Sequence, residues 1–179
     1  MDFKKLTPDF NALGKTNFAN PTVDTKNIFG VAALVASLLM VVFVFCPWFG
    51  MSAEGESISR LGITLWYGIL GFIFALATLC FSLYKHYNFA FFSSLVCVLM
   101  GILGLVCYAS LSKDGVTVDA EYVKLAVKAA KMAGAELGVD VDVIRWGSIL
   151  YFLSALVAAA GSFCAAVGLT CNACANKQE

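Results

Sequence analysis

Residues 147–170 read GSILYFLSALVAAAGSFCAAVGLT, and this stretch contains no Lys, Arg, Asp or Glu. A helix needs roughly 20 residues to cross the ~30 Å apolar core of a bilayer. Three other stretches of similar length, 28–47, 61–84 and 89–111, lack the same four residue types. The sequence therefore predicts four transmembrane helices.

The composition of the chain agrees with this prediction. Its 179 residues are 60% hydrophobic and 13% charged, whereas soluble domains are usually about 45–50% apolar and about 25% charged. Acidic and basic residues balance at 12 each, so no basic excess points to nucleic acid. We expect one transmembrane domain, 28–170, between an N-terminal tail, 1–27, and a C-terminal tail, 171–179.

Basic residues near the span ends predict the orientation of the chain. Lys4, Lys5, Lys15 and Lys26 lie in the N-terminal tail, and Lys85 lies in the tight loop between the second and third spans. The two sides hold equal numbers of basic residues overall, but short segments next to spans carry the orientation signal. We therefore predict a multi-pass protein of the plasma (inner) membrane with both termini in the cytoplasm.

The N-terminal tail also predicts a short interfacial helix. Thr7 can cap it, with Pro8 at its first position and Gly14 at its end. Such a segment would lie against the inner membrane surface or hold a cytoplasmic partner. Its apolar residues at helical spacing are Phe3, Leu6, Phe10 and Leu13.

Tryptophans mark the opposite side of the membrane. Trp48, Trp66 and Trp146 all fall at the span ends assigned to the outer face. Amphipathic rings prefer the headgroup zone, so we expect all three to lie there. Residues 48–60 between the first two spans read as a small hairpin that turns at Gly55.

Small residues predict how the spans meet. Helices in lipid associate through close van der Waals contact, and small residues line their seams. Here the small residues recur at alternating spacings of three and four, which predicts an all-α membrane protein with an antiparallel, left-handed four-helix transmembrane bundle. A seam either packs this bundle alone or also forms an oligomer interface. The candidate positions are Gly101, Gly104, Ala158, Gly161, Ala165 and Gly168.

The second extracytoplasmic loop predicts an amphipathic helix at 119–137. Its acidic start suits the positive end of a helix dipole, and its lysines gather on one narrow face. The apolar face is wide, so the helix either lies on its own membrane or bundle or docks a partner. Tyr122, Leu125, Ala129 and Met132 are the candidate contact residues on that face.

Residues suited to catalysis or metal binding are sparse. No charge lies within the spans, which disfavours an ion-coupled transporter. His86 is the only histidine, so Cys171 and Cys174 with it fall short of the four ligands of a structural zinc site. A disulfide between Cys46 and Cys107 stays open as an alternative to free thiols. We predict no enzyme activity, no cofactor, no metal and no small-molecule substrate.

The architecture resembles that of small four-span (tetraspan) membrane proteins, claudins and uncharacterised bacterial proteins among them. Trp48 followed by Leu65 and Trp66, in the order Gly62-Ile63-Thr64-Leu65-Trp66, is similar only to the Trp and Leu-Trp part of the Trp and Gly-Leu-Trp signature of the first claudin loop. The paired loop cysteines of claudins have no counterpart here, and the loop is shorter. The resemblance implies a four-span plan with inner termini, and no functional residue is carried over from it.

We therefore expect a non-enzymatic integral membrane protein with a structural, scaffolding or assembly role. Its partners would be the lipid bilayer and either further copies of itself or another membrane protein. The alternative is a subunit of an oligomeric passive channel or small permease, lined by backbone or hydroxyl groups. A third reading is an accessory subunit that holds a cytoplasmic protein through residues 1–19.

Overall fold

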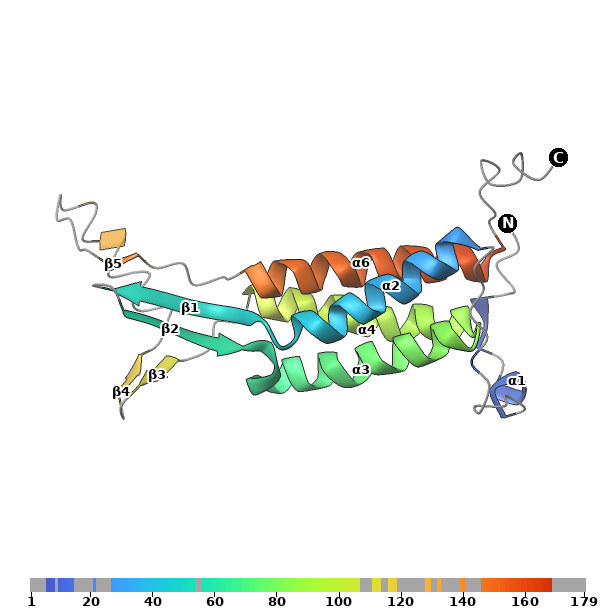
Figure 1. Ribbon diagram of the computed structural model, residues 1–179, viewed down its shortest axis with the longest axis horizontal. Helices are drawn as coiled ribbons and strands as arrows, with labels where there is room; N and C mark the ends of the chain where they lie inside the picture. Colours follow the sequence, from blue (N-terminus) through green and yellow to red (C-terminus); the bar gives the residue numbers. More distant parts are fainter. Residues whose placement is uncertain are drawn as a thin grey trace.

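The fold is known here from a computed structural model. It describes residues 6–8, 10–14, 21, 27–53, 56–106, 111–113, 116–118, 128–129, 132, 139–140 and 146–168. Four long helices lie side by side in this part of the chain (Figure 1). They are α2 (Ile28–Phe43), α3 (Trp66–Leu83), α4 (Tyr87–Val106) and α6 (Trp146–Ala166).

Each long helix packs against two neighbours. α2 contacts α3 and α6, and α4 contacts the same two helices from the other side. Strands β1 (Pro47–Ala53) and β2 (Glu56–Leu61) extend from one end of the helices, called here the hairpin end (Figure 1). The short helix α1 (Phe10–Gly14) lies at the opposite end, called the α1 end.

Among the described residues, α3, α4 and α6 are long and apolar enough to cross a membrane. The prediction of an all-α membrane protein is therefore confirmed in part: the described residues are mostly helical and include helices that could span a membrane, but two small sheets accompany them. α2 is a shorter apolar helix of 16 residues. At 1.5 Å per residue it spans about 24 Å, against about 30 Å for α4.

The first helix ends earlier than the predicted boundary at residue 47. α2 stops at Phe43, and the backbone N–H groups of Phe45 and Cys46 bond to carbonyls three residues back. Pro47 then begins β1. Proline has no N–H and disfavours a helical conformation in the residue before it, so the chain leaves the helix at this point.

The other predicted spans match helices with shifted ends. The span predicted at 61–84 begins later, because residue 61 closes β2 and Gly62–Thr64 form the 3-10 turn η2. α4 starts at Tyr87, two residues before the predicted start at 89. The predicted end of that span, residue 111, belongs instead to the strand β3 (Leu111–Lys113).

The bundle is built with small residues inside and large apolar residues outside. Ala33, Ala75, Ala90 and Ala158, one from each long helix, are fully buried. Large apolar side chains cover the outside of the same helices, which is the pattern expected when the surrounding solvent is lipid. One half-exposed example from each helix is Leu38, Ile73, Leu99 and Leu153.

Hydrogen bonds from side chains of α4 and α6 end on the backbone of α3. Ser93 of α4 donates its hydroxyl to the Phe74 carbonyl oxygen at 2.8 Å. In contrast, the buried hydroxyls of Ser82 and Ser162 have no partner among the described atoms. A buried hydroxyl that loses water without gaining a partner costs about 1–3 kcal/mol.

These hydroxyls give opposite expectations for two serine-to-alanine changes. Ser162→Ala removes an unpartnered group and should raise the free energy of unfolding by about 1 kcal/mol. Ser93→Ala deletes an interhelical bond and should lower it by roughly 0.6 kcal/mol, the average measured for such bonds in a membrane protein. Thermal unfolding in mild detergent measures both, and a destabilised Ser162→Ala protein would contradict the assignment.

The turn between α3 and α4 is a Schellman motif with an unusual residue. The His86 N–H bonds to the Phe81 carbonyl, and the Lys85 N–H bonds to the Ser82 carbonyl. This motif places the residue after the C-cap in the left-handed region, normally occupied by glycine. Lys85 holds that position with φ 60°. A left-handed conformation at a residue with a Cβ costs roughly 1–2 kcal/mol.

Replacing this residue tests the strain directly. Lys85→Gly should raise the free energy of unfolding by about 0.5–1 kcal/mol, the relief of strain less the entropy of an added glycine. Lys85→Ala retains the Cβ and is the matched control, expected to change stability little. Equal thermal stability of the two variants in detergent would contradict the strain.

The end of α6 differs from the predicted continuation to residue 170. α6 ends at Ala166, and Gly168 adopts a φ of 74° just beyond it. The Gly168 N–H bonds to the Ala165 carbonyl. Gly168 therefore terminates the helix in the left-handed conformation that glycine adopts readily. It is exposed and does not continue the small-residue seam predicted for the fourth span.

The two predicted helices outside the spans have different outcomes. α1 is five residues long and begins two residues after Pro8, so Pro8 does not occupy its first position. Most of the predicted loop helix at 119–137 lies outside the described residues. Lys128, Ala129 and Met132 are described there, and all three are helical and exposed.

Candidate functional site: the sheet anchored at the hairpin end

The segment between α2 and α3 folds as an antiparallel hairpin. β1 and β2 pair from Pro47↔Leu61 to Ala53↔Glu56. The predicted turn residue Gly55 lies outside the described residues. Two long connections link the helices at this end: the first joins α2 to α3, and the second joins α4 to α6. Strand β5 (Val139–Asp140) belongs to the second connection and pairs with the other edge of β1. The order β2–β1–β5 therefore joins both long connections in one sheet.

A second, smaller hairpin accompanies this sheet. β3 pairs with β4 (Val116–Val118) in an antiparallel register from Leu111↔Val118 to Lys113↔Val116. β3 also lies close to β2. All described strands are thus gathered at the hairpin end, beyond the four helices (Figure 1).

The β1–β2 hairpin is bonded directly to the helix ends. The Gly62 N–H donates to the Cys46 carbonyl at 3.2 Å, and the Ile63 N–H donates to the Val44 carbonyl at 2.9 Å. These bonds continue the pairing of the hairpin down to the last turn of α2. Because no unpaired linker separates the sheet from α2, the hairpin is held in a defined direction.

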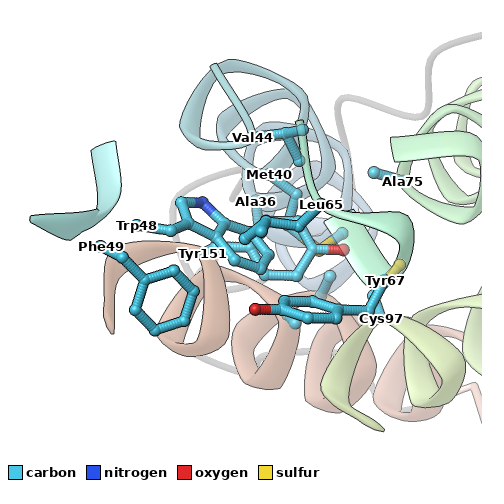
Figure 2. Close-up of a cluster of buried hydrophobic side chains, with 12 residues drawn as sticks. Ala36, Met40, Val44, Trp48, Phe49, Leu65, Tyr67, Ala75, Cys97 and Tyr151 are labelled. Atoms are coloured by element: carbon cyan, nitrogen blue, oxygen red, sulfur yellow. The ribbon is translucent and has the colours of Figure 1, made fainter. Parts of the chain in front are cut away.

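Trp48 anchors this sheet inside the bundle. Its side chain is fully buried, and its indole N–H donates to the Phe43 carbonyl at 2.9 Å. Its ring centroid lies 5.0 Å from that of Tyr151 and 6.0 Å from that of Tyr67 (Figure 2). The buried indole finds both a polar partner and aromatic neighbours, as such groups require.

The prediction that all three tryptophans lie at the headgroup zone is therefore wrong for Trp48. Trp66 and Trp146 are 63% and 53% exposed at the hairpin end, as expected for interfacial rings. Trp48 differs because it belongs to β1, whose first residues turn back over the helix ends. Phe49 beside it is also fully buried.

Two glycines make room for the Trp48 ring. A Cβ at Gly62 would lie 2.5 Å from atoms of the indole, and a Cβ at Gly104 would lie 2.8 Å from it. Gly62 precedes α3 and Gly104 lies in α4. The ring is thus held between two segments that approach it only because they carry no side chain at these positions.

Tyr151 continues the cluster into the centre of the bundle. Its hydroxyl donates to the Gly71 carbonyl of α3 at 3.0 Å. A Cβ at Gly71 would lie 2.7 Å from this hydroxyl oxygen. Tyr151 therefore connects α6 to the backbone of α3 across the bundle. Cys97 of α4 is buried beside it, with its thiol 3.9 Å from the same carbonyl oxygen.

The axis of the bundle is filled on both sides of this tyrosine. Towards the α1 end the core consists of alanines and hydroxyl side chains. Ser37, Thr78 and Ser94, from three different helices, have no exposed surface. Each donates its hydroxyl to a carbonyl of its own helix. These three hydroxyls are therefore buried and bonded within their own helices.

The candidate seam positions lie between helices of the same chain. A Cβ at Gly101 would lie 3.1 Å from the Phe152 ring, and one at Gly161 would lie 2.9 Å from the Phe29 carbonyl oxygen. Ala158 and Ala165 are also buried. With Gly104 beneath Trp48, these five positions are covered by the chain itself and are unavailable to a second copy.

The candidate positions of the loop helix divide differently. Tyr122 and Leu125 lie outside the described residues. Ala129 is exposed, and the Met132 side chain is 76% exposed. The described part of the loop therefore has residues open to a partner, but it does not place them against the sheet.

The cysteines form no cross-link among the described residues. Cys46 is a free thiol. Its proposed partner Cys107 lies outside the described residues, as do Cys171 and Cys174. In the part of the chain that the structure describes, no cluster of three or more His, Cys, Asp or Glu residues is placed to hold a metal ion.

Comparison with known proteins identifies no relative from which a function could be inferred. No family model, curated protein or solved structure matches this chain. The buried cluster around Trp48 was not predicted from the sequence. The available signal was the order Pro47-Trp48 directly after a span, since a proline ends the helix and leaves the next residue close to the helix end.

The two glycines under Trp48 allow a test of this anchor. Gly62→Ala should lower the free energy of unfolding by about 1–3 kcal/mol, because the added methyl group overlaps a rigid indole. Protease cleavage after Arg60 should become faster, because the hairpin is less firmly held when Trp48 no longer packs in the bundle. Gly14→Ala, with nothing within 4 Å of the added Cβ, is the matched control. Unchanged cleavage in Gly62→Ala would contradict the anchor.

Proposed function

We propose that this chain is a non-enzymatic, four-span membrane protein that presents a rigid sheet to a membrane-protein partner or to a second copy. The observation that supports this most directly is the seat of Trp48 in the bundle, together with backbone bonds that tie the hairpin to α2. A sheet that is already held in a fixed direction loses little conformational entropy when it binds a partner. Less of the interaction free energy is then offset by ordering the sheet.

The four-span plan includes α2 despite its short length. The fully buried residues Val44, Trp48 and Phe49 continue the apolar core beyond the end of this helix.

The spacing of buried residues supports a left-handed bundle. The buried residues of α3 at 71, 75, 78 and 82 recur at alternating spacings of four and three. This 3.5-residue period favours a left-handed crossing of the helices.

The proposed orientation places both termini in the cytoplasm of a plasma (inner) membrane. The basic N-terminal tail and Lys85 then lie on the cytoplasmic side, in accordance with the positive-inside tendency. The sheet at the hairpin end faces outwards. The architecture is that of small four-span membrane proteins, and the presented sheet replaces the longer first loop of claudins.

The contact surface that we propose is the sheet and the exposed part of the second connection. The small-residue seams are occupied by the chain itself, so they are left out of this surface. Ser59 on β2 and Met132 are exposed at described positions of these connections. The pairing of β1 with β5 attaches the second connection to the sheet, so both connections reach the hairpin end.

The alternative, an oligomeric passive channel, gains less support. The axis of a single chain is filled by Trp48, Tyr151 and the buried hydroxyl layers. A pore would have to run between chains, where each helix presents large apolar side chains. Hydrophobic surfaces of this kind do not line a hydrated path for ions at rest. The mass of the purified protein in a mild detergent distinguishes the channel from the assembly role, because a monomeric protein cannot form a pore between chains.

Site-specific cross-linking in cells tests the assembly role. A photo-reactive residue in place of Ser59 should yield one discrete adduct of higher mass. The same residue in place of Phe92, on the lipid-facing side of α4, is the matched control and should yield none. The adduct should also be lost in a Gly62→Leu background, which unseats the hairpin while leaving the apolar helices intact.

Two results would contradict the proposed role. The first is the absence of a discrete adduct from the Ser59 position in cells that hold the protein in their membranes. The second is an adduct that persists unchanged when Gly62→Leu has made the hairpin sensitive to protease, because a partner would then bind without the anchored sheet.

A further inference from the structure

The α1 end of the protein carries a small surface that the proposed function does not use. α1 is held there by two adjacent residues of the first turn of α4. The side-chain amide of Asn88 donates to the Thr7 carbonyl at 3.1 Å. The ring of Phe89 lies 5.2 Å from that of Phe10, edge to face. Phe81 extends the stack from α3, with its centroid 5.4 Å from that of Phe89.

Phe10 remains open to the surroundings despite this contact. Its side chain is 72% exposed. A single exposed apolar ring is tolerated in water, and it is stabilised when it inserts at the boundary between headgroups and acyl chains, where transmembrane helices end. The stack with Phe89 fixes Phe10 at the level where α3 and α4 end.

Lys85 supplies a positive charge at the same level. It is exposed in the turn between α3 and α4, and it is the only Lys or Arg among the described residues of the α1 end. Its left-handed φ of 60° is a conformation that glycine would adopt without strain. Strain that persists at one residue is a pointer to a role for its side chain.

The sequence around α1 adds further charge. Residues 1–15 contain Lys4, Lys5 and Lys15 against Asp2 and Asp9. Residues 1–15 thus carry one more basic than acidic residue in sequence. A basic segment close to the bilayer attracts anionic lipid, with roughly 1 kcal/mol per cation at the surface.

We propose that Phe10 and Lys85 form a contact site for the headgroup of an anionic phospholipid. The exposed ring inserts at the boundary between headgroups and acyl chains, and the ammonium group of Lys85 meets the lipid phosphate. The contacts of Asn88 and Phe89 with the segment 7–10 place this segment against the first turn of α4, which directly follows the turn that carries Lys85. This inference rests on the proposed placement of the helices across a bilayer.

Titration with lipid, read by native mass spectrometry of the purified full chain, tests the site. Phosphatidylglycerol and phosphatidylcholine are added separately to the protein in mild detergent. We expect the wild-type chain to bind phosphatidylglycerol more tightly. Lys85→Gln should weaken that binding about fivefold, the change that corresponds to one surface cation. Phe10→Ser should weaken both lipids, because it removes the inserted ring.

Matched variants separate a lost charge from a disturbed fold. Lys85→Arg retains the cation and should bind as the wild type does. Lys113→Gln removes a lysine from β3 at the opposite end and should also leave binding unchanged. Lys85→Gln retains the Cβ and thus the strain, so its thermal unfolding should match that of the wild type.

Equal binding of the two lipids, or equal losses in Lys85→Gln and Lys113→Gln, would overturn the site. These results are independent of the assembly role, because the cross-link from Ser59 reads the other end of the molecule. Extraction of the chain from membranes by alkaline carbonate would instead overturn the spanning arrangement on which both proposals rest.

Discussion

The burial of Trp48 is the contact on which the arrangement of this protein depends. The residue belongs to β1, yet its ring lies among α3, α4 and α6 and its indole N–H bonds to the end of α2. In lipid there is little hydrophobic force between helices, so close packing and satisfied polar groups hold them together. One large ring that touches several helices supplies both, and it joins the sheet to the bundle.

The rest of the core is arranged around that anchor. Next to the ring, Tyr151 crosses to the Gly71 carbonyl and fills the centre of the bundle. Beyond it, towards the α1 end, the side chains shrink to alanine and serine, and the helices approach closely. Large fully buried rings lie in the hairpin half of the core, whereas the fully buried residues of the other half include Ala33, Ser94 and Ser162.

The two ends of the bundle serve different purposes in this reading. At the hairpin end, backbone hydrogen bonds tie the hairpin to the end of α2. The α1 end has an exposed ring, an exposed lysine and a turn held in a strained conformation. One end is suited to present a protein surface, and the other is suited to meet the headgroups of the membrane.

The sequence alone determined which segments are apolar, where their small residues recur and that a hairpin divides the first two of them. These are local properties: hydropathy needs only composition, and the spacing of Gly71, Ala75 and Thr78 needs only the helical period. The tertiary structure decided that Trp48 points inwards, that α2 stops at Phe43 and that Gly101 and Gly161 pack within the chain. Each of these depends on atoms contributed by distant segments, because a side chain is buried only when other elements close around it.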